Sequence, residues 1–595
     1  MLTPEAYYTR QKEQYNTLLD KAMKESNRVA MLRLWSAIGA LAMWIWAFRA
    51  GGGWRFWPPV VLSGLFLVFV NIHNRLADKL DELRLHLSII DNELRSLNGD
   101  NTPFADGSSY TDITHAYTYD LDIFGKGSVY QMLCRIVTLG GATSLAEKLS
   151  TLVMRKEEIT MRQDIVHELS TRPELLQNFR VAGMRARENA KDHNRLIQWL
   201  TGDDMFINNQ AIRIAAVVMP VVSAIFLIWS FIIGDVYSGL TIAIVVNWML
   251  LGSFQKKIKP AIQQISNTSP LVDKYEQLMQ QVAMHEFKTP WLHEMHTQTL
   301  NSLGNIDRFK KLIRLFESRS NIFIGPVMNS LFLFDFYCLL RLEAWRKEHK
   351  TSLLTAIDAM IAIDVYVSCA VYAFNHPENI FPQINTTSNE ITAKDLRHPL
   401  LSPKVAVGND VSIGNREQFY LLTGANMTGK STFIRTVGVC NVLCNLGLPL
   451  PAKELSLPLM QLYTSMRITD SVQDDVSYFR AELNRIKMIM DTVRAAEHRC
   501  LVLLDEPLRG TNSTDKQQGT RSIVETLLTF QAMGIVATHD TGLCDMEINY
   551  PGKVSNYHFE STVDATGLSF DFRIKPGGSV SNNATILMKQ MGIVN

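Results

Sequence analysis

Four long apolar stretches interrupt a chain in which hydrophobic and polar positions otherwise mix at helical or strand spacing. The stretches are Leu34–Phe48, Trp57–Ile72, Ile214–Ile233 and Val236–Leu251. They form two pairs, one around Gly51–Gly53 and one around Gly234–Asp235, so each pair is expected to fold as a helical hairpin. Ile214–Ile233 has no charged residue. At about 1.5 Å per helical residue, it is long enough to cross a bilayer core about 30 Å thick. The pattern predicts two transmembrane hairpins.

The residues beside the hairpins indicate how they would lie in a membrane. Tryptophans, which favour the lipid–water interface, occur in or next to the apolar stretches: Trp35, Trp44, Trp46, Trp54, Trp57 and Trp248. Basic residues lie at the open ends of the hairpins: Arg33, Arg75, Lys79, Arg213, Lys256, Lys257 and Lys259. Because cytoplasmic flanks are rich in Lys and Arg, we expect a multi-pass protein of the cell (inner) membrane with its open ends in the cytoplasm. The alternative is two buried core hairpins in a soluble protein.

The rest of the pattern divides the chain into an all-α region and a C-terminal region in which buried strand-like runs alternate with helices, as in an α/β domain. The first 28 residues are charged and helix-like, which argues against a cleaved signal peptide. The expected segments are 1–28, an N-terminal amphipathic segment; 29–74, hairpin 1; 75–110, a helix and a linker rich in Gly, Ser and Asp; 111–210, a helical core; 211–255, hairpin 2; 256–390, returning helices; and 391–595, the α/β domain.

Composition narrows the possible partners. The 595 residues, 47% of them hydrophobic, are enough for several domains with sizeable cores. The formal net charge is +1, which gives no overall attraction to nucleic acid, so any DNA binding would have to be local. The seven cysteines are scattered and include no CxxC pair, which favours reduced thiols over disulfides or a zinc site.

The segment from Gly424 to Thr432 carries the most specific chemistry. It fits the P-loop pattern GxxxxGK[ST] and lies between a strand-like run and a helix-like segment. In such a loop, backbone amides and a helix N-terminus bind phosphates, Lys430 reaches the β- and γ-phosphates, and the Ser431 hydroxyl ligates Mg²⁺. The predicted nucleotide-binding residues are Gly424, Ala425, Asn426, Met427, Thr428, Gly429, Lys430, Ser431 and Thr432.

Two later strand-like runs end in residues suited to nucleotide hydrolysis. Cys500–Leu504 is followed by Asp505 and Glu506, and Gly534–Thr538 is followed by His539. We expect Asp505 to hold Mg²⁺ through water and Glu506 to act as the base for the attacking water. His539 is expected to donate a hydrogen bond to the γ-phosphate. Singly such residues are more often structural, but in this order after a P-loop they predict a nucleotide hydrolase.

Together these motifs resemble the ATPase domain of the MutS mismatch-repair proteins. The matching segments are Thr423–Thr432, which fits the family's TGxNMxGKST; Ser477–Glu482, a serine followed by an aromatic pair and a glutamate; the pair Asp505–Glu506; the polar turn Arg509–Asp515; and Thr538–His539. The resemblance implies ATP and Mg²⁺ as ligands and a homodimer formed through the ATPase domains. It also implies that Ser477 acts in trans, facing the γ-phosphate of the opposite subunit, although Asp474–Ser477 equally fits a helix N-cap.

Two positions depart from that family. Pro507 stands where an aliphatic residue usually follows the acidic pair. Val405–Val407 lacks the aromatic residue that usually stacks on adenine, which leaves the choice between adenine and guanine open.

The resemblance extends, more diffusely, to the helical region. Leu121–Ser128, Ile159–Gln163 and Asn329–Asp335 resemble the family's core and lever helices, and Arg397–Leu400 resembles the start of its ATPase domain. The two hairpins stand where the family has its mismatch-binding module and its DNA clamp. No Phe-x-Glu triplet, the family's mismatch-probing element, occurs in the sequence.

The expected protein is therefore a divergent, membrane-anchored MutS-like ATPase without the mismatch-binding module. Its fold class would be an ABC/MutS-like α/β P-loop domain behind an all-α core and lever region that transmembrane hairpins interrupt. ATP would drive a dimeric switch that moves helical levers relative to a lipid bilayer. Two alternatives are a DNA-binding mismatch-repair factor and, lowest ranked, an ABC-type transporter half, for which the chain has too few spans and no LSGGQ-like signature.

Overall fold

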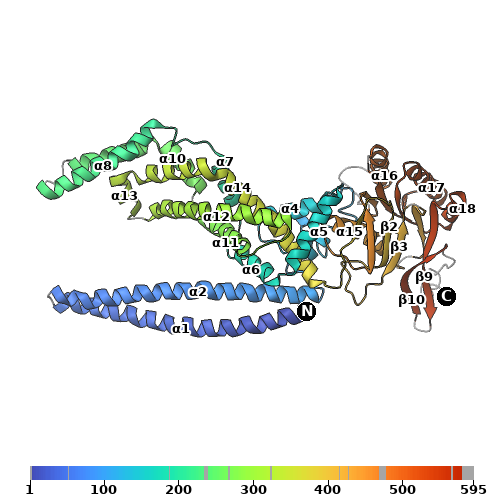
Figure 1. Cartoon of the computed structure of the whole chain (residues 1–595), viewed down its shortest axis with the longest axis horizontal. Helices are drawn as coiled ribbons and strands as arrows, with labels where there is room; N and C mark the ends of the chain where they lie inside the picture. The colour runs from blue at the N-terminus through green and yellow to red at the C-terminus, as the bar shows by residue number, and fades with distance from the viewer. Residues whose placement is uncertain are drawn as a thin grey trace.

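The computed structural model describes residues 3–50, 53–186, 188–233, 239–265, 268–321, 324–414, 416–425, 428–467, 478–496, 498–564 and 567–578. Its N-terminal region is mostly helical and its C-terminal region is an α/β domain with two sheets, which confirms the predicted order of fold classes (Figure 1). The helices extend away from the α/β domain in one direction, which gives the molecule an elongated shape.

Helices α1 (Pro4–Ala50) and α2 (Trp57–Leu97) pair as an antiparallel hairpin, with the short η1 (Gly53–Phe56) at the start of α2. The half nearer the turn exposes large apolar side chains, among them Trp35, Leu41, Trp54, Trp57 and Leu67. The other half has a small core, in which Tyr15 stacks on His86 with ring centroids 4.4 Å apart. Each helix continues through the change between charged and apolar sequence, so α1 crosses the expected boundary after residue 28 and α2 crosses the one after residue 74.

Eleven further α-helices precede the central helix among the described residues, ten of them between residues 129 and 317. These ten are α3 (Val129–Leu133), α4 (Leu139–Ser150), α5 (Lys156–Ser170), α6 (Pro173–Met184), α7 (Ala190–Thr201), α8 (Gln210–Ile233), α9 (Gly239–Ser253), α10 (Gln255–Ile265), α11 (Ser269–Ala283) and α12 (Pro290–Glu317). The 3-10 turns η2 (Ser108–Tyr110) and η3 (Ser318–Ser320) and the short helix α13 (Ile324–Phe332) complete this part.

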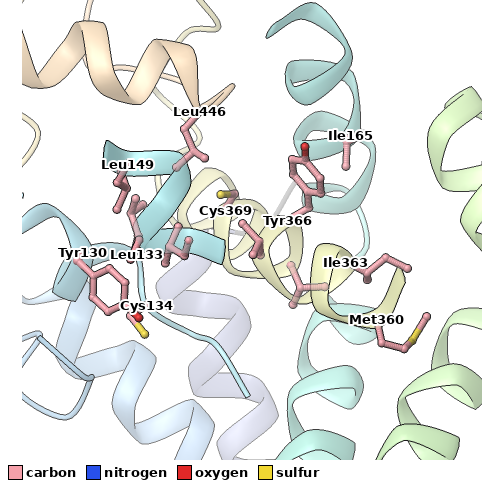
Figure 2. Packing of buried hydrophobic residues seen from close by; sticks show 14 of the residues in the cluster. Tyr130, Leu133, Cys134, Leu149, Ile165, Met360, Ile363, Tyr366, Cys369 and Leu446 are labelled. Carbon is pink, nitrogen blue, oxygen red and sulfur yellow. The ribbon is translucent and has the colours of Figure 1, made fainter. Parts of the chain in front are cut away.

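The central helix of this region is α14 (Phe334–Asn375), which packs against α12, α5 and α4. Figure 2 shows its buried face, where Ile363, Tyr366 and Cys369 lie near Leu133 of α3 and Leu446 of the α/β domain. The hydrophobic core is thus continuous from the helices into the α/β domain. By length and composition α14 could cross a membrane, but 72% of its most apolar window is buried inside the protein. It is therefore a core helix.

Helices α8 and α9 form the second apolar hairpin, and the residues predicted as its turn, Gly234–Asp235, lie outside the described residues. Isoleucines along α8 are exposed, including Ile225, Ile228 and Ile232. Helix α13 packs against both helices, and its last residues, Asn329–Phe332, belong to the segment expected as a returning helix. Asn247, buried on α9, donates hydrogen bonds to the Ser223 hydroxyl (3.2 Å) and the Ser330 carbonyl (2.7 Å). A polar contact thus joins the three apolar helices.

Both apolar hairpins extend away from the α/β domain, on the same side of the molecule (Figure 1). By length and composition, four described helices could cross a membrane: Pro4–Arg49, Gly53–Leu97, Gln210–Ser230 and Phe334–Asn375. The first three expose nearly all of their most apolar window, whereas the fourth is α14. The buried fraction therefore separates hairpin-type helices from a core helix of similar hydropathy.

The α/β domain contains a four-stranded sheet of order β1-β5-β2-β3 and a six-stranded sheet of order β10-β9-β4-β8-β7-β6. The strands are β1 (Gln383–Asn385), β2 (Ile391–Leu396), β3 (Asn409–Ile413), β4 (Phe419–Thr423), β5 (Glu454–Pro458), β6 (Gln461–Ser465), β7 (Cys500–Asp505), β8 (Met533–Ala537), β9 (Val554–Asp564) and β10 (Gly567–Pro576). The helices are α15 (Lys430–Asn445), α16 (Tyr478–Ala495), α17 (Ser513–Thr529) and α18 (Met546–Asn549), with the turn η4 (Thr541–Asp545).

The parallel arrangement of the larger sheet positions the candidate site. Strand β4 pairs in parallel with β8 and β9, and β7 pairs in parallel with β8 and β6. Because the carboxyl ends of parallel strands lie at one edge of a sheet, the residues that follow β4, β7 and β8 come together there. Those residues are the predicted P-loop, the acidic pair and His539.

Candidate functional site

The P-loop segment follows β4, whose five residues are all buried, and leads directly into α15. Gly424 and Gly429 have positive φ angles of 138° and 110°, a conformation that favours glycine. At Gly424 a Cβ atom would lie 2.8 Å from the Phe559 carbonyl oxygen, so the loop needs glycine there for space as well. Asn426 and Met427, two of the predicted nucleotide-binding residues, lie outside the described residues.

Lys430, the first residue of α15, is only 5% exposed. Its ammonium donates to the carbonyl oxygens of Gly424 (2.5 Å) and Ala425 (2.8 Å), and the Thr428 hydroxyl donates to the Ala425 carbonyl (2.8 Å). Burial lowers the pKa of Lys430, and the nearby carboxylates of Glu506 and Asp505 act in the opposite direction. The lysine is therefore a buried cation held inside the loop.

Ser431 and Asp505 come from different elements and meet at the strand edge. The Ser431 hydroxyl, on α15, donates to Oδ2 of Asp505 at the end of β7 over 2.6 Å. The Asp505 carboxylate is largely buried, and the Arg509 guanidinium approaches it to 3.9 Å. The structure thus brings together the two residues predicted to hold Mg²⁺, and a hydroxyl beside a carboxylate is the type of oxygen pair that this ion prefers.

Glu506 and His539 lie in contact at the same edge. Nε2 of His539 lies 2.5 Å from Oε1 of Glu506, and its Nδ1 lies 2.9 Å from the Gly424 carbonyl oxygen. The hydrogen bond from His539 lowers the pKa of Glu506 to about 2, opposed by burial and assisted by Arg509. Glu506 also has a positive φ of 53°, a strained backbone of the kind found at functional sites.

Ser477, the residue predicted to act in trans, lies outside the described residues. The helix that follows it, α16, is held by the buried carboxylate of Glu482, which accepts a hydrogen bond from the Leu508 amide (2.6 Å). Phe479 lies against the turn after Glu506, where a Cβ atom at Gly510 would be 2.9 Å from the Phe479 Cβ. Phe479 and Glu482 of this motif therefore also have a structural role within one chain.

A cavity of about 310 Å³ opens beside the P-loop helix. Its lining includes Gly429, Phe433, Phe559 and Phe572, together with Val405. Two of these aromatic residues come from β9 and β10, far along the sequence from the position where the family has its aromatic residue. Neither Phe559 nor Phe572 lies in a local sequence motif, so the sequence analysis did not identify them.

Comparison with known proteins relates this site to one family. Residues 420–593 match the family described as MutS domain V. Over 291 residues the chain is 29% identical to the DNA mismatch repair protein MutS of Thermotoga sp. (strain RQ2), covering 48% of this chain and 32% of that protein. It is 32% identical over 225 residues to the DNA mismatch repair protein MutS of Clostridioides difficile (strain 630), covering 36% and 23%. It is 28% identical over 218 residues to the Endonuclease MutS2 of Enterococcus faecalis (strain ATCC 700802 / V583), covering 36% and 27%. The chain spans about a third or less of the length of these relatives.

Proposed function

We propose that this chain, which belongs to the MutS family through its C-terminal region, is a Mg²⁺-dependent ATPase that works as a dimeric switch anchored in a membrane. One observation carries the ATPase proposal. The carboxyl ends of three parallel strands bring Lys430, the Ser431–Asp505 pair and the Glu506–His539 pair to one edge of the sheet. Members of this family are ATPases, and these residue types are the ones that phosphoryl transfer uses.

The P-loop would bind the phosphates of ATP. Phosphate oxygens would replace the Gly424 and Ala425 carbonyls as acceptors for the Lys430 ammonium, which a modest side-chain movement allows. Ser431 and Asp505 fit Mg²⁺ by their oxygen donors and would hold it, Asp505 through water. The bound ion would neutralise charge on the phosphates. The aromatic cavity with Phe559 and Phe572 would take the base.

Glu506 would act as the base and His539 would control it. A carboxylate with a pKa of about 2 is a poor base at neutral pH, because the proton it takes is held weakly. Turning His539 from Glu506 toward the γ-phosphate would remove the hydrogen bond that lowers this pKa. The same histidine would then contact the phosphate, so nucleotide binding and activation of the base would be linked through one side chain.

The dimer and the membrane anchor rest on different observations. Dimerisation through the ATPase domains, with Ser477 acting in trans, is supported by the family relationship. Anchoring is supported by two hairpins that expose their apolar side chains and extend in one direction (Figure 1). Three exposed lysines, Lys256, Lys257 and Lys259, follow hairpin 2 on α10. This placement would leave the ATPase domain in the cytoplasm of a multi-pass protein of the cell (inner) membrane.

A DNA-binding mismatch-repair factor is the second candidate, because the relatives in the comparison are named for that process. It would require local DNA contacts, since the net charge is only +1. Filter binding of homoduplex and mismatched DNA over a salt series separates the candidates. Non-specific phosphate contacts weaken steeply with salt, whereas preference for a mismatch should persist. Salt-resistant mismatch preference would favour the repair factor.

Phosphate release by the purified full-length protein, with ATP and Mg²⁺, tests the ATPase proposal. Lys430→Ala is expected to reduce ATP binding and to lower turnover at least about tenfold, because it removes the cation in the P-loop. Lys453→Ala is the matched control, since this lysine is exposed and pairs with Asp395 away from the P-loop. Turnover that Lys430→Ala leaves unchanged would refute ATP hydrolysis at this site.

A further inference from the structure

The segment between hairpin 1 and α3 binds the α/β domain through two aspartates that are not part of the proposed nucleotide site. Asp120 is buried, and its Oδ2 accepts hydrogen bonds from the Thr464 hydroxyl (2.7 Å) and the Met466 amide (3.2 Å). Its Oδ1 accepts from the Arg467 amide (2.9 Å). Asp120 therefore fixes the end of β6, from which the chain continues toward Ser477 in sequence.

Asp122 binds two arginines from different elements. Its carboxylate accepts two hydrogen bonds from the Arg467 guanidinium, at 2.5 and 3.0 Å. The same carboxylate lies 3.3 Å from Arg435, which is on the P-loop helix α15. Asp122 has a positive φ of 53°, so its backbone is held in an uncommon conformation that directs it between the two arginines. Next to it, Leu121 packs on α15 at Gly438, where a Cβ atom would lie 2.9 Å from the leucine methyl carbons.

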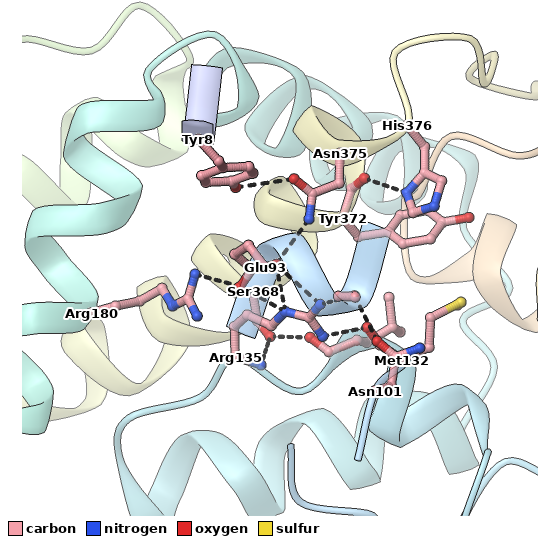
Figure 3. Close-up of polar contacts among 12 residues, drawn as sticks. Tyr8, Glu93, Asn101, Met132, Arg135, Arg180, Ser368, Tyr372, Asn375 and His376 are labelled. Atoms are coloured by element: carbon pink, nitrogen blue, oxygen red, sulfur yellow. Dashed lines mark hydrogen bonds and ion pairs between the residues drawn. The ribbon is translucent and has the colours of Figure 1, made fainter. Parts of the chain in front are cut away.

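The backbone of Asp122 continues this contact into the helical region. The Val129 amide, at the start of α3, donates to the Asp122 carbonyl over 3.1 Å. Arg135, just after α3, forms a buried ion pair with Glu93 of α2 at 3.1 Å. Figure 3 shows that Arg180 and Asn375 also contact Glu93, at 2.7 and 2.9 Å, and that Tyr8 of α1 contacts Asn375. A series of short contacts thus leads from α15 to both helices of hairpin 1.

We propose that Asp122 is a positioning residue for the proposed ATP site. Asp122 holds the P-loop helix and the end of β6 at a fixed position relative to each other, and it links this arrangement to hairpin 1. The proposal rests on the proposed ATPase function and names how the helical region would control the same site. Asp122 contacts none of Lys430, Ser431 or Glu506 in the structure, so it acts through Arg435 and Arg467.

The charges of Arg435 and Arg467 explain why the Asp122 carboxylate controls the geometry between α15 and β6. Arg435 and Arg467 are like charges on α15 and beside β6, and Asp122 is the carboxylate that pairs with both. Without it the two guanidiniums repel, and the end of β6 is expected to move away from α15. The side chains of Asp122 and Arg467 are 36% and 39% exposed, and ion pairs this exposed contribute little to stability. Loss of the carboxylate should therefore change the geometry of the site without unfolding the domain.

Asp122→Asn in the full-length protein tests the proposal through separate measurements of ATP affinity and turnover. We expect ATP affinity within about threefold of wild type and turnover lowered on the order of tenfold, because the P-loop stays intact while its relation to β6 changes. Asp122→Glu should recover most of the turnover. Asp112→Asn is the matched control, because this exposed aspartate of the same segment bonds to Thr114 within its own turn.

Amide hydrogen exchange at residues 464–467 gives a readout that does not depend on hydrolysis, with exchange about tenfold faster expected in Asp122→Asn. If Asp122→Asn does not fold, Arg467→Gln removes the same contact from the other side. Wild-type turnover and exchange in either variant, while Lys430→Ala abolishes hydrolysis, would overturn the role of Asp122 and leave the ATPase proposal standing. Absence of hydrolysis in wild type would refute the ATPase proposal, and the exchange result would still decide whether Asp122 fixes β6.

Discussion

Replacement of Glu506 by glutamine is the most direct perturbation of the proposed chemistry. Glutamine keeps the size of the side chain and an oxygen that can accept the hydrogen bond from His539, but it cannot take a proton from water. The contacts of the P-loop, Lys430 and the Ser431–Asp505 pair are separate from Glu506 in the structure. ATP binding should therefore persist while hydrolysis fails.

The expected size of the effect follows from the role of a general base and from the contact between Glu506 and His539. Loss of a general base typically lowers turnover about 10²- to 10⁴-fold, or about 3–5 kcal/mol of activation free energy. The pKa of Glu506 is about 2 against an ordinary value of 4.5, which corresponds to about 3 kcal/mol in favour of the charged carboxylate. Because this pKa is lowered, its stabilising contribution is present above pH 4.5 and is lost as the pH falls toward 2. At neutral pH the variant should thus lose this contribution as well as turnover.

Single-turnover hydrolysis and equilibrium ATP binding, measured on the same preparations, separate chemistry from binding. Glu454→Gln is the matched control, because that glutamate is exposed and pairs with Lys394 on the four-stranded sheet. A double variant with His539→Asn should lose less than the sum of the two single losses, since the two side chains share a contact of 2.5 Å. Wild-type turnover in Glu506→Gln would remove Glu506 from the mechanism, and additive losses in the double variant would show that His539 does not act through it.

Three further predictions address the dimer, the membrane and the connection to hairpin 1. Mixing Lys430→Ala and Ser477→Ala proteins should partly restore turnover, since some heterodimers would contain one intact site; no recovery with heterodimers demonstrated would argue for a site completed within one chain. In a cysteine-free background, a cysteine at Gly53 should react with an impermeant reagent in intact cells, and one at Ser253 only after permeabilisation. Carbonate should not extract the protein from membranes. Protection of both cysteines together with release by carbonate would identify the hairpins as core elements. Glu93→Gln should lower stability by about 3–5 kcal/mol, because Arg135 and Arg180 would remain buried without their counter-charge; an unchanged melting temperature, with Glu82→Gln as the exposed control, would contradict this.

The site residues that could be predicted from the sequence are those that belong to short contiguous motifs. Lys430, Asp505 and His539 each follow a buried strand, and a parallel sheet necessarily brings such residues to one edge. The order of the fold classes was predictable for the same reason, since apolar spacing is a local property. Neither inference required knowledge of which distant segments pack together.

The parts that the sequence did not predict depend on tertiary contacts. Phe559 and Phe572 reach the cavity beside the P-loop only because β9 pairs with β4, so their position in the chain gives no signal. Part of helix α13 lies in the segment expected as a returning helix, but its packing on α8 and α9 depends on tertiary contacts, and it is too short for the length rule that identifies spans. The linker expected after the helix in 75–110 also proved to be packed. Gly107 has a positive φ of 69°, and a Cβ atom there would lie 2.7 Å from the Tyr130 ring.

The position of α14 explains how a change at the proposed ATP site could reach both hairpins. This helix of 42 residues spans about 63 Å at about 1.5 Å per residue. Its first residues follow α13, which packs on hairpin 2, and its last residue, Asn375, contacts Glu93 of hairpin 1 just before the chain enters β1. Since its middle is buried in a close-packed core, α14 should move as a rigid body. A tilt of about 3° at the end beside the α/β domain would then displace the far end by about 3 Å, on the scale of helix shifts in known switches. A movement of the α/β domain would act on hairpin 1 directly through Glu93, and on hairpin 2 through the length of α14. The two hairpins should therefore move relative to each other.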